Sequence, residues 1–313
     1  MTAGKPTTAR PTILVLGEAI TAFMHYPSDD PLTFHGPFPS GAPAIFASAA
    51  ARLGAAVELV AGIGDDAFGV QFRERMETHG VSTGPLVVDP GRPTACVFVS
   101  YRPGGSRTFM FYLEGTAALS ADAEALDRAA TADWLHVSGA TLWFGGTTGA
   151  TTWLAIERAI AAGTPISFDP NVRADDLSPV VRTQFDALLG VARVVLASAG
   201  ELEAIGGSEA AIIARGGTVV YKAGAAGAVV VTADGRWSVS APAANEVDPD
   251  GAGDIFAAGY VVAAAMGRDP RDCARVGVGA ASASVEVHGP MESTILPIEA
   301  YLTGGAGGRA LAE

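Results

Sequence analysis

The sequence has little positive charge. Its 313 residues contain 20 Lys and Arg against 33 Asp and Glu, which gives a formal net charge of −13. This balance argues against a nucleic-acid or anionic-membrane partner, because such partners are bound by clustered cations and no basic patch is visible. An acidic protein that handles phosphates must place its few cations locally.

The sequence also lacks a disulfide framework, a metal-ligand pattern and a long apolar run. Its two cysteines, Cys96 and Cys273, are far apart, and its histidines show no metal spacing. We therefore expect free thiols in a reducing compartment. Residues 1–10 have no signal-peptide core, and no segment approaches the ~18 apolar residues of a membrane span. These absences predict a cytoplasmic protein, with disordered tails at 1–10 and 304–313.

Two common catalytic motifs are missing as well. No G-x-S-x-G elbow of a serine hydrolase occurs, and residues 14–20 lack the G-x-G-x-x-G that follows the first strand of many dinucleotide-binding domains. A hydrolase of that kind and a nicotinamide-dependent dehydrogenase are both disfavoured.

What the chain does contain is a regular alternation of strand and helix patterns. Short apolar runs indicate buried strands at 13–16, 57–60, 134–137, 166–168, 194–196, 219–222 and 228–231. Helical spacing occupies 43–53, 151–162 and the segment from about Gly253 to Met266. The alternation predicts an α/β fold of three layers, a mostly parallel sheet with helices on both faces, in one domain over 11–300.

One region interrupts this alternation. Residues 96–101 and 107–112 are rich in β-branched and aromatic side chains and flank R-P-G-G-S, so they predict a hairpin. Residues 18–40 are also too irregular for a βαβ unit. We expect the stretches 18–40 and 92–114 to form a small β-sheet lid over the carboxyl ends of the main strands, where open α/β sheets bind ligands.

The most informative segment is D-P-D-G-A-G-D-I-F, residues 248–256. The small residues Gly251, Ala252 and Gly253 let a ligand approach the backbone at the start of a helix, where unpaired amides and the helix dipole favour an anion. Asp254 follows in the first turn. A phosphate held beside a carboxylate base indicates phosphoryl transfer to a hydroxyl, although a tight loop before a capped helix is the simpler alternative.

The chain resembles the ribokinase-like (PfkB) carbohydrate kinases, and is nearest in pattern to 2-keto-3-deoxygluconate kinases and fructokinases. The resemblance covers about residues 14–289. It rests on S-G-A-P-A-I-F-A-S-A-A-A-R-L-G at 40–54, G-I-G-D-D-A-F-G at 62–69 and the 248–259 segment, with smaller matches at 168–173, 198–201 and 222–227.

The resemblance implies a catalytic role for the 248–256 segment. Asp254 would take the proton from the acceptor hydroxyl as it attacks the γ-phosphate of ATP. Gly251, Ala252 and Gly253 would form the anion hole for the transferred phosphoryl group.

It also implies a set of residues for ATP and Mg²⁺. Glu201 would hold Mg²⁺ through water, although an exposed first-turn glutamate is the alternative. Ser198 stands where the family usually has Asn. The residues assigned to the nucleotide are Lys222, Gly224, Gly227, Asn171, Ser198 and Asp248. For Lys222 and Asn171, a solvated strand-end lysine and a plain turn asparagine remain open.

The acceptor side departs from the family pattern. By resemblance the substrate would contact Glu18, Gly41, Tyr112, Arg173 and Asp254. Ile45 replaces an asparagine that binds substrate hydroxyls in relatives, Ala22 replaces an aspartate of ribokinases and many fructokinases, and Leu113 replaces an arginine after the lid tyrosine. Asp250 stands where the family has Thr or a small apolar residue, and it adds negative charge near the phosphates.

The sequence therefore predicts an ATP-dependent kinase for a small sugar or sugar acid, with no nucleic acid and no membrane as partner. A nucleoside or polyol kinase on the same scaffold remains open, because Ile45 makes the acceptor pocket less polar. A non-catalytic sugar- or nucleotide-binding protein is a third hypothesis. Relatives also imply a homodimer formed through the lid.

Overall fold

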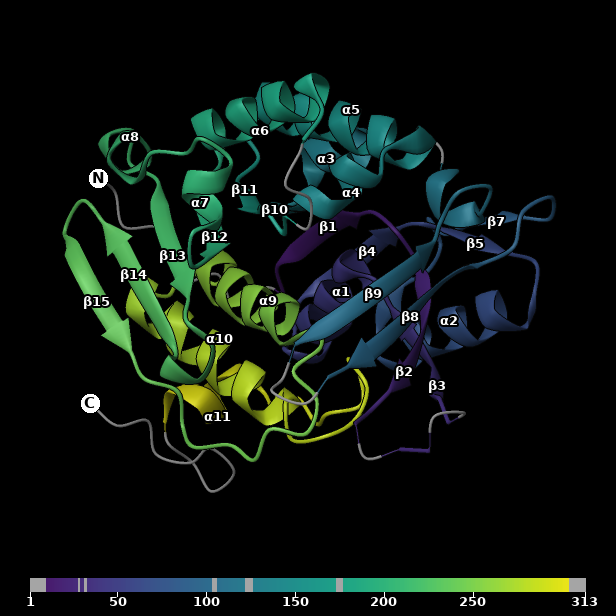
Figure 1. Cartoon of the computed structure of the whole chain (residues 1–313). Helices are drawn as coiled ribbons and strands as arrows, with labels where there is room; N and C mark the ends of the chain where they lie inside the picture. Colours follow the sequence, from purple (N-terminus) through teal and green to yellow (C-terminus); the bar gives the residue numbers. More distant parts are fainter. Residues whose placement is uncertain are drawn as a thin grey trace.

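The computed structural model of the chain describes residues 10–27, 29–30, 33–102, 106–121, 126–172 and 177–303. Within them the largest sheet has nine strands in the order β15-β14-β13-β12-β11-β10-β1-β4-β6 (Figure 1). The bounds are β1 Thr12–Leu16, β4 Ala56–Val60, β6 Val81–Ser82, β10 Trp134–Ser138, β11 Ile166–Asp169, β12 Val194–Ser198, β13 Thr218–Lys222, β14 Ala228–Thr232 and β15 Gly235–Val239. Neighbours from β6 to β13 are parallel, and β14 and β15 are antiparallel. The mostly parallel sheet is therefore confirmed.

Helices cover both faces of this sheet, as expected. In β1, Ile13 and Val15 enter one hydrophobic cluster, whereas Leu14 and Leu16 enter another, because successive side chains of a strand point to opposite faces. The first cluster includes α1 Ala42–Arg52, α2 Ala67–Thr78, α9 Ala252–Ala265, α10 Pro270–Ser284 and α11 Ile298–Leu302. The second includes α3 Leu126–Thr131, α4 Gly139–Phe144, α5 Gly146–Ala162, α6 Pro179–Val191, α7 Glu201–Ala204 and α8 Glu209–Ala214.

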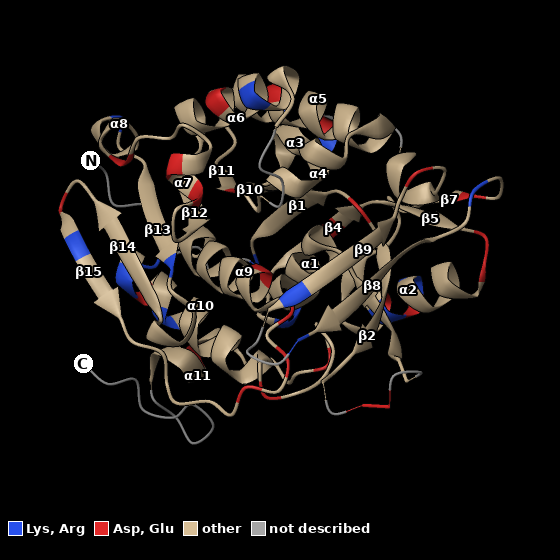
Figure 2. Ribbon diagram, viewed as in Figure 1, with Lys and Arg blue, Asp and Glu red and all other residues tan. Residues whose placement is uncertain are grey.

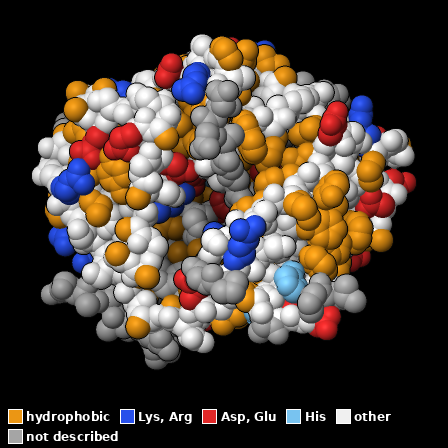
Figure 3. Space-filling model, in the orientation of Figure 1, with side chains coloured by type: hydrophobic (Ala, Val, Ile, Leu, Met, Phe, Trp, Pro, Cys, Tyr) orange, Lys and Arg blue, Asp and Glu red, His pale blue; other side chains and the backbone are white. Residues whose placement is uncertain are grey.

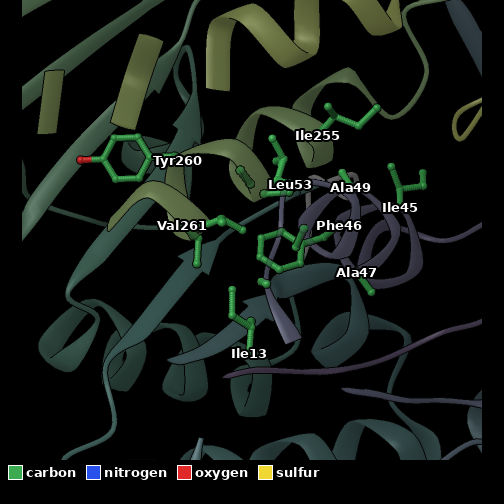
Figure 4. Close-up of a cluster of buried hydrophobic side chains, with 14 of the residues drawn as sticks. Ile13, Ile45, Phe46, Ala47, Ala49, Leu53, Ile255, Tyr260 and Val261 are labelled. Atoms are coloured by element: carbon green, nitrogen blue, oxygen red, sulfur yellow. The ribbon is translucent and has the colours of Figure 1, made fainter. Parts of the chain in front are cut away.

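Helix α9, which positions the candidate base, is buried over most of its length. All of its residues from 255 to 263 are buried, because it is apolar on every side and is enclosed by α1, α10 and the sheet. Figure 4 shows Ile255 and Val261 of α9 beside Phe46 of α1 and Leu53 at its C-cap, above Ile13 of β1. The start of α9 is therefore held by a close-packed core.

The predicted helix at 151–162 proved too short at its start. Helix α5 begins at Gly146, five positions earlier. The extra turn is rich in threonine, which has a low helix propensity, so the sequence did not predict a helix there. Here Thr148 donates to the carbonyl of Ala118 (2.8 Å), and Thr151 donates to that of Ala121 (3.1 Å), so their buried hydroxyls are satisfied.

A separate four-stranded sheet, β3-β2-β8-β9, forms the lid. Its strands are β2 Ile20–His25, β3 His35–Ser40, β8 Ala95–Tyr101 and β9 Arg107–Tyr112. β8 and β9 pair antiparallel, so the predicted hairpin is confirmed. In Figure 1 this sheet lies beside the start of α9. A two-stranded sheet of β5 Gly62–Gly64 and β7 Val87–Asp89, which we did not predict, completes the strands of the described chain.

None of the described helices combines the length and the hydropathy needed to cross a membrane. The expected tails at 1–10 and 304–313 lie outside the described residues, apart from Arg10.

Candidate active site

The glycine at the start of α9 is required by the backbone. Gly251 is the N-cap of the helix and has φ 76°, which favours glycine. A Cβ atom added there would lie 2.9 Å from Pro290 and 3.1 Å from Ile45. The helix begins at Ala252, one residue before the predicted start, and Asp254 lies in its first turn. The first amides of α9 thus point out of the helix beside a carboxylate.

Lys222 brings a positive charge to the same helix end. Its Nζ lies 2.6 Å from Oδ2 of Asp169, the last residue of β11, and 3.5 Å from the point where a Cβ on Gly253 would stand. Burial by itself would lower the pKa of Lys222, but the carboxylates of Asp169, Glu201 and Asp254 raise it above its usual value. Lys222 is therefore a fixed cation beside the G-A-G segment.

Glu201 links two loops at the carboxyl edge of the sheet. It is the first residue of α7, and its carboxylate accepts hydrogen bonds from the amides of Ser198 (2.6 Å) and Val172 (2.9 Å). The side chain of Ser198 is exposed. The described residues contain no group of three His, Cys, Asp or Glu side chains that could hold a metal. Both oxygens of the Glu201 carboxylate are thus engaged by backbone amides.

Asn171 has the strained backbone that functional loops often carry. It follows β11 and has φ 44°, and it is the non-glycine residue with positive φ among those described. It lines the same cavity as Asp254. The structure thus brings Asn171, which we assigned to the nucleotide, into the lining of the cavity that also contains Asp254.

A cavity between the lid and the main sheet is the candidate acceptor pocket. Its polar lining includes Glu18, Gly41, Asn171, Asp250 and Asp254, and its apolar lining includes Ile20, Ile45, Val97, Phe109, Phe111 and Phe144. Glu18 is 2% exposed and accepts a hydrogen bond from Thr141 (2.8 Å). Figure 3 shows that this face of the molecule is hollowed between the two sheets, and Figure 2 shows acidic residues on α7 and α9 and a basic residue on β9 around that hollow.

Gly41 must be glycine for a structural reason too. Its φ is 107°, and a Cβ atom there would stand 2.4 Å from the carbonyl oxygen of Glu18. Three of the five residues predicted to bind substrate, Glu18, Gly41 and Asp254, therefore meet in one pocket. Arg173, the fourth, lies outside the described residues.

Tyr112, the fifth, is placed differently from our expectation. It is 56% exposed, on the outer face of the lid, where its ring meets the ring of Phe98 at 5.9 Å. Side chains alternate along β9, so Phe109 and Phe111 take the inner face and line the pocket. The outward orientation of Tyr112 does not support the predicted contact with the acceptor, and Phe111, its neighbour in sequence, is the residue that lines the cavity.

Gly224 and Gly227 lie in the turn between β13 and β14, with φ of 55° and 96°. A Cβ atom on Gly227 would stand 2.0 Å from the carbonyl oxygen of Val239 in β15, so packing alone requires this glycine. Gly224 has open space where its Cβ would be. Of the two, Gly224 is the one whose surroundings leave room for a ligand.

The carboxylate of Asp248 is hydrogen-bonded within the protein. It is 1% exposed, and its carboxylate accepts hydrogen bonds from the hydroxyls of Tyr26 (2.7 Å) and Tyr101 and from the amides of Gly289 (2.9 Å) and Asp250 (3.0 Å). Burial raises the pKa of Tyr101, and so do the carboxylates of Asp250 and Asp248, so its hydroxyl keeps its proton. These contacts support a link between the lid and the α9 loop, not the nucleotide contact that we expected.

Sequence reasoning missed several residues of the site. Asp169 pairs with Lys222, Thr141 donates to Glu18, and Arg107 of the lid pairs with Asp250 at 3.1 Å. The alternation of aromatic residues in 107–112 was the available signal for the inner face of the lid. The other contacts join segments far apart in sequence, and no local pattern indicates them.

Comparisons with known proteins agree with this geometry. The pfkB family carbohydrate kinase model matches residues 13–297. The chain is 30% identical to the 2-dehydro-3-deoxygluconokinase of Thermoproteus tenax over 95% of both chains. It is 31% identical to the fructokinase of Salmonella typhimurium over 75% of this chain and 79% of that one. A candidate ribokinase II from E. coli, solved in complex with ATP and Mg²⁺, has a TM-score of 0.83 at 28% identity and covers 94% of this chain and 98% of its own. The chain therefore belongs to the pfkB family of carbohydrate kinases and is a phosphotransferase.

Proposed function

We propose that the chain is a cytoplasmic, ATP-dependent kinase that phosphorylates a hydroxyl group of a sugar or sugar acid of the 2-keto-3-deoxygluconate or fructose type. The observation that carries the proposal is the start of α9, where Asp254 lines a pocket covered by the lid and the charged Lys222 lies beside Gly253. The similar ribokinase II binds ATP and Mg²⁺. The free thiols of Cys96 and Cys273 fit a reducing compartment.

In this proposal Asp254 is the general base. It removes the proton from the acceptor hydroxyl as the oxygen attacks the γ-phosphate, and the bond from that phosphorus to the leaving oxygen of ADP breaks. The amides of Gly251, Ala252 and Gly253 hold the transferred group, with the helix dipole behind them. Because the transition state for this transfer is loose, the protein contributes mainly by orientation and by neutralising charge.

The described carboxylates fit a hydrated Mg²⁺ near the phosphates. Glu201, Asp169 and Asp254 all act on the charge of Lys222, so three carboxylates gather at this edge of the sheet. Mg²⁺ keeps several waters in protein sites and prefers oxygen ligands. Glu201 would hold the ion through water while its oxygens stay bonded to the amides of Ser198 and Val172. The bound ion would neutralise charge on the phosphates.

On the nucleotide side, Lys222 supplies a point charge for the phosphates and Asn171 a polar side chain at the pocket boundary. Gly224 offers open backbone next to the end of β13. We also retain Gly227 and Ser198 in the proposed nucleotide site. Gly227 is required by packing and would contribute through the shape of its turn, and Ser198 would contribute by holding Glu201 with its amide.

The acceptor would lie between Glu18, Gly41 and Asp254, with Phe109 and Phe111 against its apolar side. Arg173 stays a proposed contact for a carboxylate or a hydroxyl pair of the substrate. The pocket also supports the second candidate, a nucleoside or polyol kinase. Ile45 lines it together with three phenylalanine rings, which is more apolar surface than a sugar acid requires.

A panel of sugars, sugar acids, polyols and nucleosides, assayed for ADP release in the presence of ATP and Mg²⁺, separates these candidates. We expect turnover with a keto-sugar or a keto-sugar acid. Turnover with nucleosides alone would favour the second candidate. Tight binding of ATP and sugar without any ADP release would instead support a binding protein.

The role of Asp254 is tested by Asp254→Asn. Asparagine has nearly the size and shape of aspartate, so the fold should survive, but the base is lost and turnover should fall about 10²–10⁴-fold. The matched control is Asp269→Asn at the N-cap of α10, where the carboxylate accepts from the amides of Arg271 and Asp272. This control should keep its turnover. An Asp254→Asn enzyme with wild-type turnover would overturn the assignment.

We also propose that two copies associate through the outer face of the lid. This face exposes Phe34, Met110 and Tyr112, at 45%, 51% and 56%, and Phe23 and Phe98 stack beside them at 5.2 Å. Figure 3 shows hydrophobic side chains gathered over this part of the molecule. Contiguous exposed apolar surface of this kind marks interaction sites.

A further inference from the structure

The segment just before the anion hole holds the lid through two carboxylates. Asp248 accepts from Tyr26, which follows β2, and from Tyr101, which ends β8. Asp250 lies 3.1 Å from a guanidinium nitrogen of Arg107, the first residue of β9. Three strands of the lid are therefore tied to a stretch of three residues that leads directly into Gly251.

The two contacts differ in what they do to the phosphate side. Asp248 is buried and surrounded by donors, so its charge is already satisfied. Asp250 lines the acceptor pocket together with Asp254 and precedes the N-cap of α9 by one residue. A second carboxylate there opposes the binding of a phosphoryl group, because like charges a few ångströms apart repel strongly outside bulk water.

Arg107 is the described cation that offsets this charge. Its guanidinium group lies over the rings of Tyr101 and Phe109, at 5.9 and 5.7 Å, and these rings hold its plane towards Asp250. The side chain of Asp250 is 11% exposed and that of Arg107 is 28% exposed, so the pair is largely shielded from water. The lid thus supplies the counter-charge for a residue of the anion-hole loop.

We propose that Arg107 is a positioning residue for phosphoryl transfer and acts through Asp250. With Arg107 in place, the charge of Asp250 is offset, and the lid strand that bears Phe109 and Phe111 is held over the acceptor. This explains how the chain tolerates an aspartate where related kinases have Thr or a small apolar residue. The inference rests on the proposed kinase function.

The test is a double-mutant cycle of Arg107→Ala and Asp250→Thr, with kcat and the KM values for acceptor and ATP measured for each enzyme. Arg107→Ala removes the cation that lies 3.1 Å from Asp250, so kcat should fall about 100-fold. Asp250→Thr removes that charge, and kcat should fall less than about tenfold. The double variant should recover to within about tenfold of wild type, because neither charge remains.

Rescue is the outcome that a purely structural contact would not give. Arg107→Lys keeps the positive charge and should retain more of kcat than Arg107→Ala. The matched control is Arg102→Ala, which removes an exposed arginine from the same lid hairpin and should leave kcat unchanged. Melting temperatures of all variants check that the fold is intact.

A double variant as slow as Arg107→Ala would overturn the inference, because Asp250 would then not be the group on which Arg107 acts. Failure of the proposed function looks different. In that case the wild-type enzyme releases no ADP with any acceptor of the panel, before any variant is compared.

Discussion

The two walls of the candidate site are built from different chemistry. The wall on the main sheet carries fixed charges, namely Asp254, Lys222 with its partner Asp169, and Glu201 bonded to backbone amides. The wall on the lid is aromatic and is fastened by tyrosine hydroxyls and one arginine. Phosphoryl transfer needs charges that do not move, whereas the acceptor needs a surface of matching shape. Substitutions on the two walls should therefore fail in different ways.

After loss of the base Asp254, the largest effect on the sheet wall is expected with Lys222→Met. In the proposed mechanism Lys222 contacts the phosphates, so its loss should lower kcat about 10²–10³-fold. It should also destabilise the fold by about 3–5 kcal/mol, because the buried carboxylate of Asp169 loses its partner. Steady-state kinetics and urea unfolding measure the two losses separately.

The double variant Lys222→Met with Asp169→Asn separates these roles. It removes both charges of the buried pair, so most of the stability should return, while kcat should stay low. Recovery of kcat together with stability would show that Lys222 serves the fold alone. Lys222 would then have no catalytic role in the sheet wall.

The sheet wall was the part that the sequence predicted well. Apolar runs and glycines are local signals, so the strands, the start of α9 and the position of Asp254 in its first turn followed from them. The same holds for Lys222 at the end of β13. Its partner Asp169 was not predicted, because that ion pair depends on how β11 and β13 lie in the sheet.

The lid wall shows where such reasoning stops. Alternation in 107–112 predicts that Phe111 and Tyr112 lie on opposite faces of the lid. It does not predict which face meets the pocket, because a register shift of one residue exchanges the two faces. That choice is made by contacts such as the one from Tyr101 to Asp248, which joins residues 147 positions apart. Long-range contacts of this kind leave no periodic trace in the sequence.

A smaller effect, again on the sheet wall, is a loss of folding stability at low pH. His136 lies in β10 under the site, stacks on Phe46 at 3.7 Å and bonds to Ser167 at 2.9 Å. Burial first, and then the charge of Lys222, lowers the pKa of His136 from 6.5 to about 3. The folded protein therefore excludes a proton that the unfolded chain takes up below about pH 6.5, so this stability is full above that pH and is lost as pH falls.

At pH 4.5 the resulting loss should be about 2–3 kcal/mol, from roughly 1.4 kcal/mol per pH unit below the unfolded pKa. Urea unfolding at pH 7 and pH 4.5 measures it, with His136→Gln as the comparison, since glutamine does not titrate. The variant should be less stable at pH 7 but lose less on acidification. An equal loss in both proteins would remove His136 as the cause.

The smallest expected effect compares the two faces of the lid itself. Phe111→Ala removes a ring that lines the pocket and should raise the KM for the acceptor about tenfold, which is near 1.4 kcal/mol, with little change in the KM for ATP. Tyr112→Ala is its matched control one residue away. It should leave the acceptor KM within about twofold, because its side chain faces outward, and it should weaken self-association measured by light scattering. If Tyr112→Ala raised the acceptor KM more than Phe111→Ala did, the inner and outer faces of the lid would have to be exchanged, and the aromatic wall would be Tyr112, Met110 and Phe98 instead.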